Sequence, residues 1–193
     1  EAVKIARPVF VLEPSGRYRA TADMSLGGGI VGNIPLGSAQ AKVAVDNDRV
    51  NLNELTANVM NGLVNGNAVI ALNTRGSSSI VADFADLDLA KLAALQGGRV
   101  IPVEGKTSGK VNLTLTGTDY RTTSGSINAV IAANAGKVDA NKVPVSGNVN
   151  LSATNGLFNV DLAKLNTAKS ELNASGRFDL RNEDSNCRAK PSR

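Results

Sequence analysis

Three carboxylates, Asp83, Asp86 and Asp88, cluster within six residues of this chain of 193 residues. Carboxylate oxygens are the ligands that hard cations such as Ca²⁺ prefer. The same residues also have structural uses, because an Asp at a helix start accepts backbone N–H groups. We expect the structural use: Asp86 or Asp88 caps a helix, Asp83 lies on the solvent side of a strand, and no metal is bound.

Nucleophilic and acid–base chemistry lacks its usual residues. The sequence contains no His, so a Ser–His or Cys–His pair cannot be built. The single Cys187 lies in the polar segment RNEDSNCRAKPSR and cannot form a disulfide or a cysteine metal site within one chain. With no Trp and two Tyr, a sugar-stacking cleft is also hard to assemble. We predict that the chain is not an enzyme and has no catalytic residue and no cofactor. The alternative, an enzyme acting on an envelope polymer, would be supported by activity that a single substitution of Asp83 or Glu104 abolishes.

Phosphate and nucleic-acid binding are not indicated either. The run Gly27–Gly29 lacks the Lys and helix that follow the glycines of a phosphate-binding loop, so it predicts a tight turn or linker. The 21 Lys and Arg residues are spread singly along the chain. Nucleic-acid binding requires clustered basic residues interleaved with aromatic ones. We therefore expect no nucleic-acid partner.

The elements that position these side chains are predicted to be strands. In KVNLTL, residues 110–115, Val111, Leu113 and Leu115 alternate with polar residues, and LNASGRFDL, residues 172–180, follows the same period of two. Turn signals such as DNDR, MNG and TNG recur about every 10 to 15 residues, which favours antiparallel neighbours. The predicted fold is all-β, mainly antiparallel, with one short helix.

That helix is predicted in DLDLAKLAALQGG, residues 86–98. Leu89, Leu92 and Leu95 recur at helical spacing, and paired Gly follows. The pentapeptide DLAKL occurs again at residues 161–165, where the surrounding alternation is that of a strand. The same five residues are therefore predicted to take two conformations, since tertiary context overrides weak propensity.

A degenerate repeat organises the chain. IPLGSAQAKVAV, IPVEGKTSGKVNLTL and VPVSGNVNLSA begin near residues 34, 101 and 143, and their unequal spacing argues against a solenoid of uniform coils. Residues 1–180 are predicted to form a single repeat-built segment, and residues 181–193 a polar tail. No apolar run approaches the roughly 18 residues that span a bilayer, and residue 1 opens inside strand-like sequence without a signal peptide. We expect an excerpt of a longer protein.

The segment ADFADLDLAKLAALQGGRVIPVEGKTSGKVNLTLTGTDYRTTSGSINAVIAA, residues 82–133, resembles the AsmA-like superfamily of bacterial envelope proteins. VPVSGNVNLSATNGLFNVDLAKLNTAKSELNASGRFDL, residues 143–180, resembles the repeated strands of its TamB-like (translocation and assembly module) members. The resemblance, over roughly residues 20–180, implies a long sheet bent into a U-shaped apolar groove. It also implies a place in the periplasm, as part of a protein anchored in the inner membrane of a Gram-negative-type envelope.

The resemblance further implies a role in phospholipid transport between membranes and in the assembly or secretion of outer-membrane proteins. Its partners would be phospholipid acyl chains or nascent outer-membrane strands and, through regions absent from this chain, an outer-membrane β-barrel assembly protein. Which lipid or client is carried, and in which direction, is not encoded in these residues.

The alternation itself leaves two interpretations open. A sheet with one apolar face must cover that face with protein or with a ligand, and each sheltered methylene is worth roughly 0.8 kcal/mol. The apolar rows therefore either line a lipid-binding groove or form the closed core of a structural or adhesive β-solenoid or sandwich. The predicted lining residues are Val43, Val45, Val111, Leu113, Leu115, Ile127, Ile131, Val149, Leu151, Phe158, Val160, Phe178 and Leu180.

Overall fold

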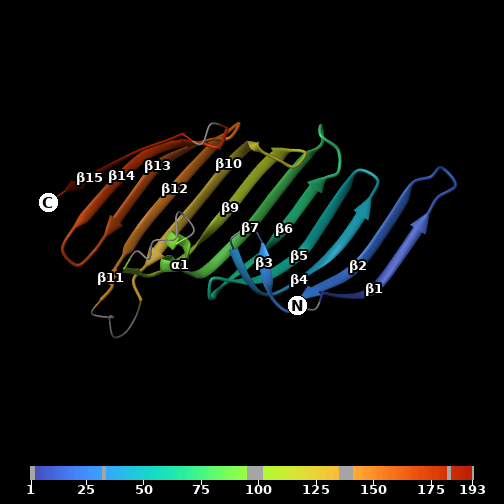
Figure 1. Ribbon diagram of the computed structural model, residues 1–193, viewed down its shortest axis with the longest axis horizontal. Coiled ribbons are helices and arrows are strands. Elements are labelled where there is room, and N and C mark those ends of the chain that lie inside the picture. The colour runs from blue at the N-terminus through green and yellow to red at the C-terminus, as the bar shows by residue number, and fades with distance from the viewer. Residues whose placement is uncertain (1–2, 32–33, 95–101, 135–140, 182–183, 193) are drawn as a thin grey trace.

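The chain folds as a long antiparallel sheet with one short helix, seen in a computed structural model that describes residues 3–31, 34–94, 102–134, 141–181 and 184–192 (Figure 1). Thirteen strands make the main sheet, and neighbours in sequence are neighbours in space along nearly its whole path. The strands of the main sheet are β1 (Val3–Leu12), β2 (Tyr18–Leu26), β3 (Gly29–Val31), β4 (Ile34–Asp46), β5 (Arg49–Val59), β6 (Gly62–Ala71), β7 (Ser77–Asp88), β9 (Lys106–Thr116), β10 (Asp119–Ala132), β12 (Ser146–Thr154), β13 (Leu157–Asn166), β14 (Glu171–Asp179) and β15 (Asp184–Ser192).

A small covering unit lies at one end of the central strands. It consists of α1 (Leu89–Ala94) and a two-stranded parallel sheet, β8 (Val103–Glu104) with β11 (Val143–Pro144). The two later copies of the repeat therefore begin side by side in this unit, whereas the first begins a long strand of the main sheet. Because Ile101 is outside the described residues, the second copy is seen only from Pro102 onward.

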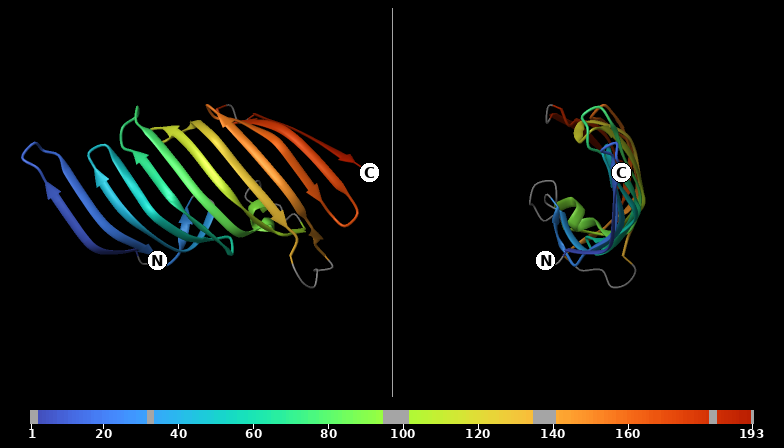
Figure 2. Two further views of the ribbon diagram at one scale, coloured as in Figure 1. Left: turned by 180° about the vertical axis from the view of Figure 1, so that it is seen from behind. Right: turned by 90° about the vertical axis from the view of Figure 1, so that its right-hand side faces the viewer.

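Curvature turns the sheet into a trough (Figure 2). Seen end-on, the strands follow an open curve, and α1 lies on its concave side. Register shifts accompany the bend, and three of them place Arg7, Glu54 and Asp86 at positive φ. Bulges of this kind bend a strand and increase its local twist, so charged residues at regular places on the outer face help to set the shape.

The sheet is not closed into a compact core. The chain exposes 12552 Å², whereas a compact protein of 19.9 kDa exposes about 8,700 Å². No large side chain in the described part of the chain is fully buried, and alanines make up much of what is buried. The surface that a sandwich would bury between two sheets is therefore left open along the trough.

The structure confirms the predicted fold class: nearly all antiparallel β in a long curved sheet, with one short helix. It also confirms the two conformations of DLAKL, since residues 89–92 begin α1 and residues 161–165 lie in β13. The helix begins at Leu89, after the predicted start at residue 86, because residues 86–88 continue β7; residues 95–98 are outside the described part. Residues 184–192, expected to be a polar tail, instead pair with β14 as β15.

Candidate functional site

The candidate site is the concave face of the main sheet from β1 to β14, called the trough from here on. Its apolar residues lie opposite one another across each strand pair and form rows that run along the sheet. One row crosses nine strands without a charged residue. It consists of Val43, Leu52, Ala68, Ile80, Leu113, Gly125, Ala153, Phe158 and Phe178.

A second row runs beside it from β5 to β14. Like the first, it mixes large aliphatic with small residues and contains no charged residue. Its members are Leu55, Gly66, Ala82, Val111, Ile127, Leu151, Val160 and Gly176.

All but one of the predicted lining residues lie in strands on this face. The exception is Leu180, which follows β14 in a turn where its N–H donates to Gly156 O at 2.9 Å. Two others are buried and not freely accessible: Ile131 is 6% exposed and Phe158 is 7% exposed. The remaining members are half-buried, as the wall of an open trough should be.

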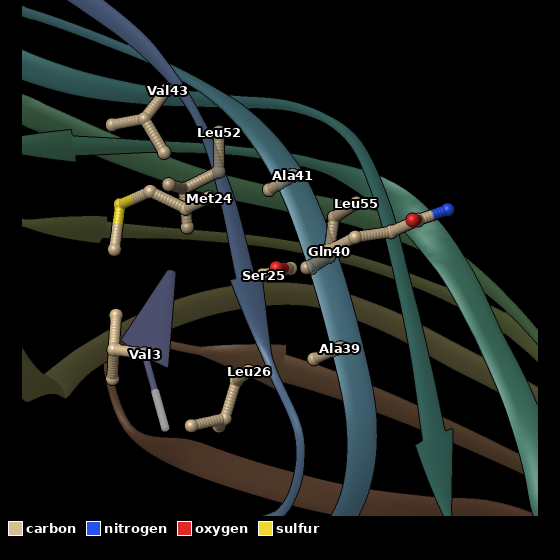
Figure 3. A pocket seen from close by; sticks show the side chains of 10 residues that line it. All are labelled: Val3, Met24, Ser25, Leu26, Ala39, Gln40, Ala41, Val43, Leu52 and Leu55. Atoms are coloured by element: carbon tan, nitrogen blue, oxygen red, sulfur yellow. The ribbon is translucent and has the colours of Figure 1, made fainter. Parts of the chain in front are cut away.

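Two hollows mark the end of the trough formed by β1, β2, β4 and β5. One, of about 200 Å³, is lined largely by apolar side chains that include Met24, Leu26 and Leu52 (Figure 3). The other, of about 470 Å³, includes Ile5 and Phe10 of β1. Both hollows contain Val43, one of the predicted lining residues.

The sequence prediction missed the residues that complete this end. Alternation is present in β1 and β2, but Arg7 and Pro8 interrupt it in β1, and the bulge at Glu54 shifts the apolar positions of β5 from Leu52 to Leu55. A search that allows one inserted residue in the period of two would have found them. The missed residues of the trough include Val3, Ile5, Phe10, Ala22, Met24, Leu26, Ala41, Leu52, Leu55, Val64, Ile80 and Phe84.

Aromatic rings lie on the concave face at two places. Phe158 and Phe178 are cross-strand partners whose rings stack with centroids 4.8 Å apart. Phe84 lies over Gly109, because a Cβ added at Gly109 would stand 2.7 Å from Phe84 Cζ. Large rings are thus accommodated by small neighbours, so the floor stays shallow and continuous.

The covering unit closes the trough at one edge only. Leu87, Thr107 and Ile131, all on the concave face, are buried where β8, β11 and α1 lie over it. Two polar atoms buried there, Glu104 Oε1 and Thr107 Oγ1, have no hydrogen-bond partner among the described residues. Glu104 itself is 8% exposed.

The acidic cluster considered for a cation has structural partners. Asp88 Oδ1 accepts the N–H groups of Ala90 at 3.0 Å and Lys91 at 3.4 Å, so Asp88 caps α1. Asp83 lies on the convex face and pairs with Lys110 at 3.3 Å. Among the residues that the structure describes, no group of three or more His, Cys, Asp or Glu is placed to hold a metal.

The convex face is polar and carries paired charges across neighbouring strands. Arg7 pairs with Asp23 and Lys42 pairs with Glu54, the latter at 2.6 Å. On β14, Asn173 donates a hydrogen bond to Glu171 and lowers the pKa of that carboxyl, and the adjacent Lys164 lowers it further. The two faces therefore differ sharply: charge and amide groups outside, hydrocarbon inside.

No helix in the described part of the chain is long and apolar enough to cross a bilayer. No family model, no curated protein and no solved structure matches this sequence or fold.

Proposed function

We propose that the trough shelters the acyl chains of phospholipids, as a periplasmic segment of an AsmA-like, TamB-like envelope protein that serves phospholipid transport between membranes and outer-membrane protein assembly. The observation that carries the proposal is the apolar concave face that runs across the main sheet and is left open to solvent. Exposed apolar surface of this extent is typical of a binding site.

The dimensions of the trough suit hydrocarbon chains. Eleven strands lie along its path from β1 to β14, and with about 4.8 Å between neighbours the trough is roughly 50 Å long. One leaflet of a bilayer has a hydrocarbon thickness of roughly 15 Å, half of about 30 Å. More than one acyl chain could therefore lie end to end along the rows.

The chemistry of the rows favours movement as well as binding. Each fully buried methylene is worth roughly 0.8 kcal/mol, so a chain of about a dozen methylenes gains several kcal/mol even when only one side is covered. Val, Leu, Ile and Ala offer similar contacts at every step. A chain that slides along a row therefore exchanges like contacts for like, and no step holds it strongly.

The alternative function, a structural or adhesive domain with a closed core, would need a second layer over the concave face. In the described residues that face is covered only at the edge under α1, β8 and β11. Nascent outer-membrane strands, which also alternate apolar and polar residues, are the second candidate occupant of the same surface.

The test is site-specific photo-crosslinking combined with mass spectrometry of lipids that copurify with the protein. A photoreactive residue at Leu113 or Leu151 is expected to crosslink phospholipid. The same group at Asn112 or Asn150, one position away and on the convex face, is the matched control and should not. A lipid-free protein, or equal crosslinking from both faces, would contradict the proposal.

A further inference from the structure

Five turns gather along one rim of the trough, opposite the covering unit, and are called the turn rim from here on (Figure 1). They connect β1 to β2, β4 to β5, β6 to β7, β9 to β10 and β12 to β13. Hydrogen bonds join successive turns: the Leu72 N–H donates to Asp48 O at 2.7 Å, and the Gly117 N–H donates to Gly76 O at 2.7 Å. The central part of the rim is therefore one connected structure, which fixes the order and spacing of its side chains.

Arginine and tyrosine are concentrated at the turn rim. Both tyrosines of the chain, Tyr18 and Tyr120, lie in the first two residues of a strand that follows one of its turns. No lysine in the described part of the chain lies within three residues of these turns, whereas five exposed arginines do: Arg17, Arg19, Arg49, Arg75 and Arg121. Arginine differs from lysine in its planar fork of N–H donors, which fits a phosphate in bidentate fashion. The segregation therefore indicates phosphate recognition.

The middle of the rim brings two of these arginines onto neighbouring turns. The β6–β7 turn, which contains Arg75, packs against the β9–β10 turn, since a Cβ added at Gly117 would stand 3.2 Å from Thr74 Cα. Arg121 follows the second turn. Its guanidinium carbon lies 5.6 Å from the centroid of the Tyr120 ring, and Tyr120 is 55% exposed. Two guanidinium groups and one accessible aromatic ring are thus available at one place.

Charge is most positive at this place. One acid, Asp119, lies in or beside the two turns, and its Oδ1 accepts the Arg121 N–H at 3.0 Å. In the part of the chain that the structure describes, neither Arg75 nor Arg121 forms an ion pair. The two turns nearer to the N-terminus, by contrast, have acids that balance their arginines: Glu13, Asp46 and Asp48.

The two turns are fixed to the wall of the trough. Leu115 lies on the concave face of β9, two residues before Gly117, which is about 7 Å along an extended strand. Ser78, the cross-strand partner of Leu115, is 3% exposed. Its hydroxyl accepts the Ala71 N–H at 2.9 Å and donates to Gly117 O. A lipid whose acyl chains lie on the apolar rows would therefore bring its headgroup within reach of this rim.

We propose that Arg75, Tyr120 and Arg121 form a headgroup site, in which the guanidinium groups bind the phosphate of a phospholipid and the tyrosine ring packs at the boundary between its polar and apolar parts. Tyrosine suits such a boundary because one end of its side chain is apolar and the other is polar. This inference rests on the proposed function and identifies what holds the part of the lipid that hydrocarbon contacts leave outside. Successive turns are two strands, or about 10 Å, apart, so the other rim arginines continue the site along the trough.

Two lipids with the same acyl chains separate headgroup binding from acyl-chain binding. Isothermal titration calorimetry compares dioctanoyl phosphatidylglycerol with dioctanoyl glycerol, which has no phosphate, both as monomers in solution. The unmodified protein is expected to bind the phosphate-bearing lipid at least ten-fold more tightly. Arg75→Gln and Arg121→Gln should each reduce that affinity at least three-fold and leave the affinity for dioctanoyl glycerol unchanged. Lys169→Gln, in the exposed β13–β14 turn on the opposite rim, is the matched control and should change neither.

Asp119→Asn tests the same site with the opposite sign. Asn keeps an oxygen that can accept the Arg121 N–H but removes the negative charge beside the phosphate, so affinity for phosphatidylglycerol should rise about two-fold. A variant that merely damaged the turn would instead lower it. Unchanged or weaker binding of phosphatidylglycerol by Asp119→Asn would count against the site.

The outcomes distinguish this inference from the function on which it rests. Equal affinity for the two lipids would overturn the headgroup site and leave acyl-chain binding in place, whereas binding of neither lipid would overturn both. Inorganic phosphate that displaces phosphatidylglycerol at equal concentration would show a site for free phosphate instead. If Arg75→Gln weakens sedimentation with phosphatidylglycerol vesicles but not binding of the monomeric lipid, the rim contacts a bilayer surface and the proposal is wrong.

Discussion

Gly109 shows how a residue without a side chain leaves space for a neighbouring ring on the concave face of the sheet. A Cβ at this position would contact Asn128 O, approach Phe84 Cζ to 2.7 Å and Ala129 Cα to 2.9 Å. Glycine leaves room for the Phe84 ring to lie across the strand, and the ring in turn covers the exposed backbone, an arrangement known as aromatic rescue of a strand glycine.

We expect Gly109→Ala to lower the free energy of unfolding by about 1–3 kcal/mol, the usual cost of overpacking. The measurement is urea denaturation followed by circular dichroism. Gly27→Ala is the matched control, because nothing lies within 4 Å of a Cβ added there, and it should change stability by less than about 0.5 kcal/mol. Equal stability of the two variants would show that neither Phe84 nor the backbone of Asn128 and Ala129 stands as close to Gly109 as described.

Asp179 gives a pH-dependent prediction. Hydrogen bonds from the Arg181 side chain, followed by that residue's backbone N–H, lower the pKa of Asp179 to about 2 from an ordinary 3.8. Because the folded pKa is depressed, the stabilisation is present above the unfolded pKa and is lost as pH falls from about 4 through about 2.

Carboxyl NMR titration should therefore find Asp179 ionised well below pH 4. Arg181→Gln is expected to raise the pKa of Asp179 toward its ordinary range, although the backbone hydrogen bond keeps part of the shift. If Asp179 titrates normally in the unmodified protein, the pair does not form in solution.

At the scale of elements, the alternation of apolar and polar residues predicted the strands correctly but did not predict where the strands bulge. Val111, Leu113 and Leu115 lie on one face as their alternation requires. In β5, by contrast, Leu52 and Leu55 share a face at odd spacing because Glu54 is an inserted residue with positive φ. A bulge depends on the register of two strands, which no single segment encodes, so the curvature it produces was predicted from resemblance alone.

The DLAKL segments make the same point about helices. Residues 88–92 and 161–165 are identical, yet only the first copy enters a helix, where Asp88 caps α1 and the Leu89 N–H donates to Gly105 O at 3.1 Å. In the second copy, Ala163 and Lys164 pair with β12 and β14 on both sides. The partners that decide between the conformations are distant in sequence, so the pentapeptide cannot specify either one.

The covering unit of α1, β8 and β11 contains an identifiable weak point. Glu104 is 8% exposed, and its Oε1 has no hydrogen-bond partner in the part of the chain that the structure describes. A buried polar atom without a partner carries its desolvation cost uncompensated.

Glu104→Met, which keeps an unbranched side chain of similar length, is expected to raise the free energy of unfolding by about 1–3 kcal/mol. Denaturant titration measures it, and Glu13→Met, at an exposed turn position, should have little effect. A loss of stability in Glu104→Met would instead mean that this carboxyl has a favourable partner, such as a bound cation, in solution.

At the scale of the whole molecule, the open face is the property that the sequence left undecided. Periodicity shows that one face is apolar, but a closed sandwich and an open trough produce the same alternation. Two features distinguish the open trough from the closed sandwich. The described residues contain no second amphipathic layer. The chain also pairs each strand with the next, from β4 to β7 and from β12 to β15. That meander extends the sheet and never folds it back over itself.

A continuous trough also predicts that a charged side chain placed near its middle slows the movement of lipid along it. Leu113 lies on β9 in the long row between Ile80 and Gly125, and Asp is too short to lift its charge out of a hydrocarbon layer. Placing a carboxylate there costs a passing acyl chain about 2–3 kcal/mol on membrane-insertion scales. Leu113→Asp should therefore slow the exchange of a fluorescent phospholipid between the protein and vesicles at least ten-fold.

Crosslinking to lipid from Val45, at the β1 end of the trough, should persist in that variant, because the hollows there do not involve β9. Val81→Asp is the matched control: Val81 is 52% exposed on the convex face of the neighbouring strand, where a charge meets only water and polar side chains. If both variants slow exchange alike, the effect comes from the sheet as a whole and not from a path along its concave face. Selective slowing by Leu113→Asp would locate the path of the lipid in the row that the strand register defines.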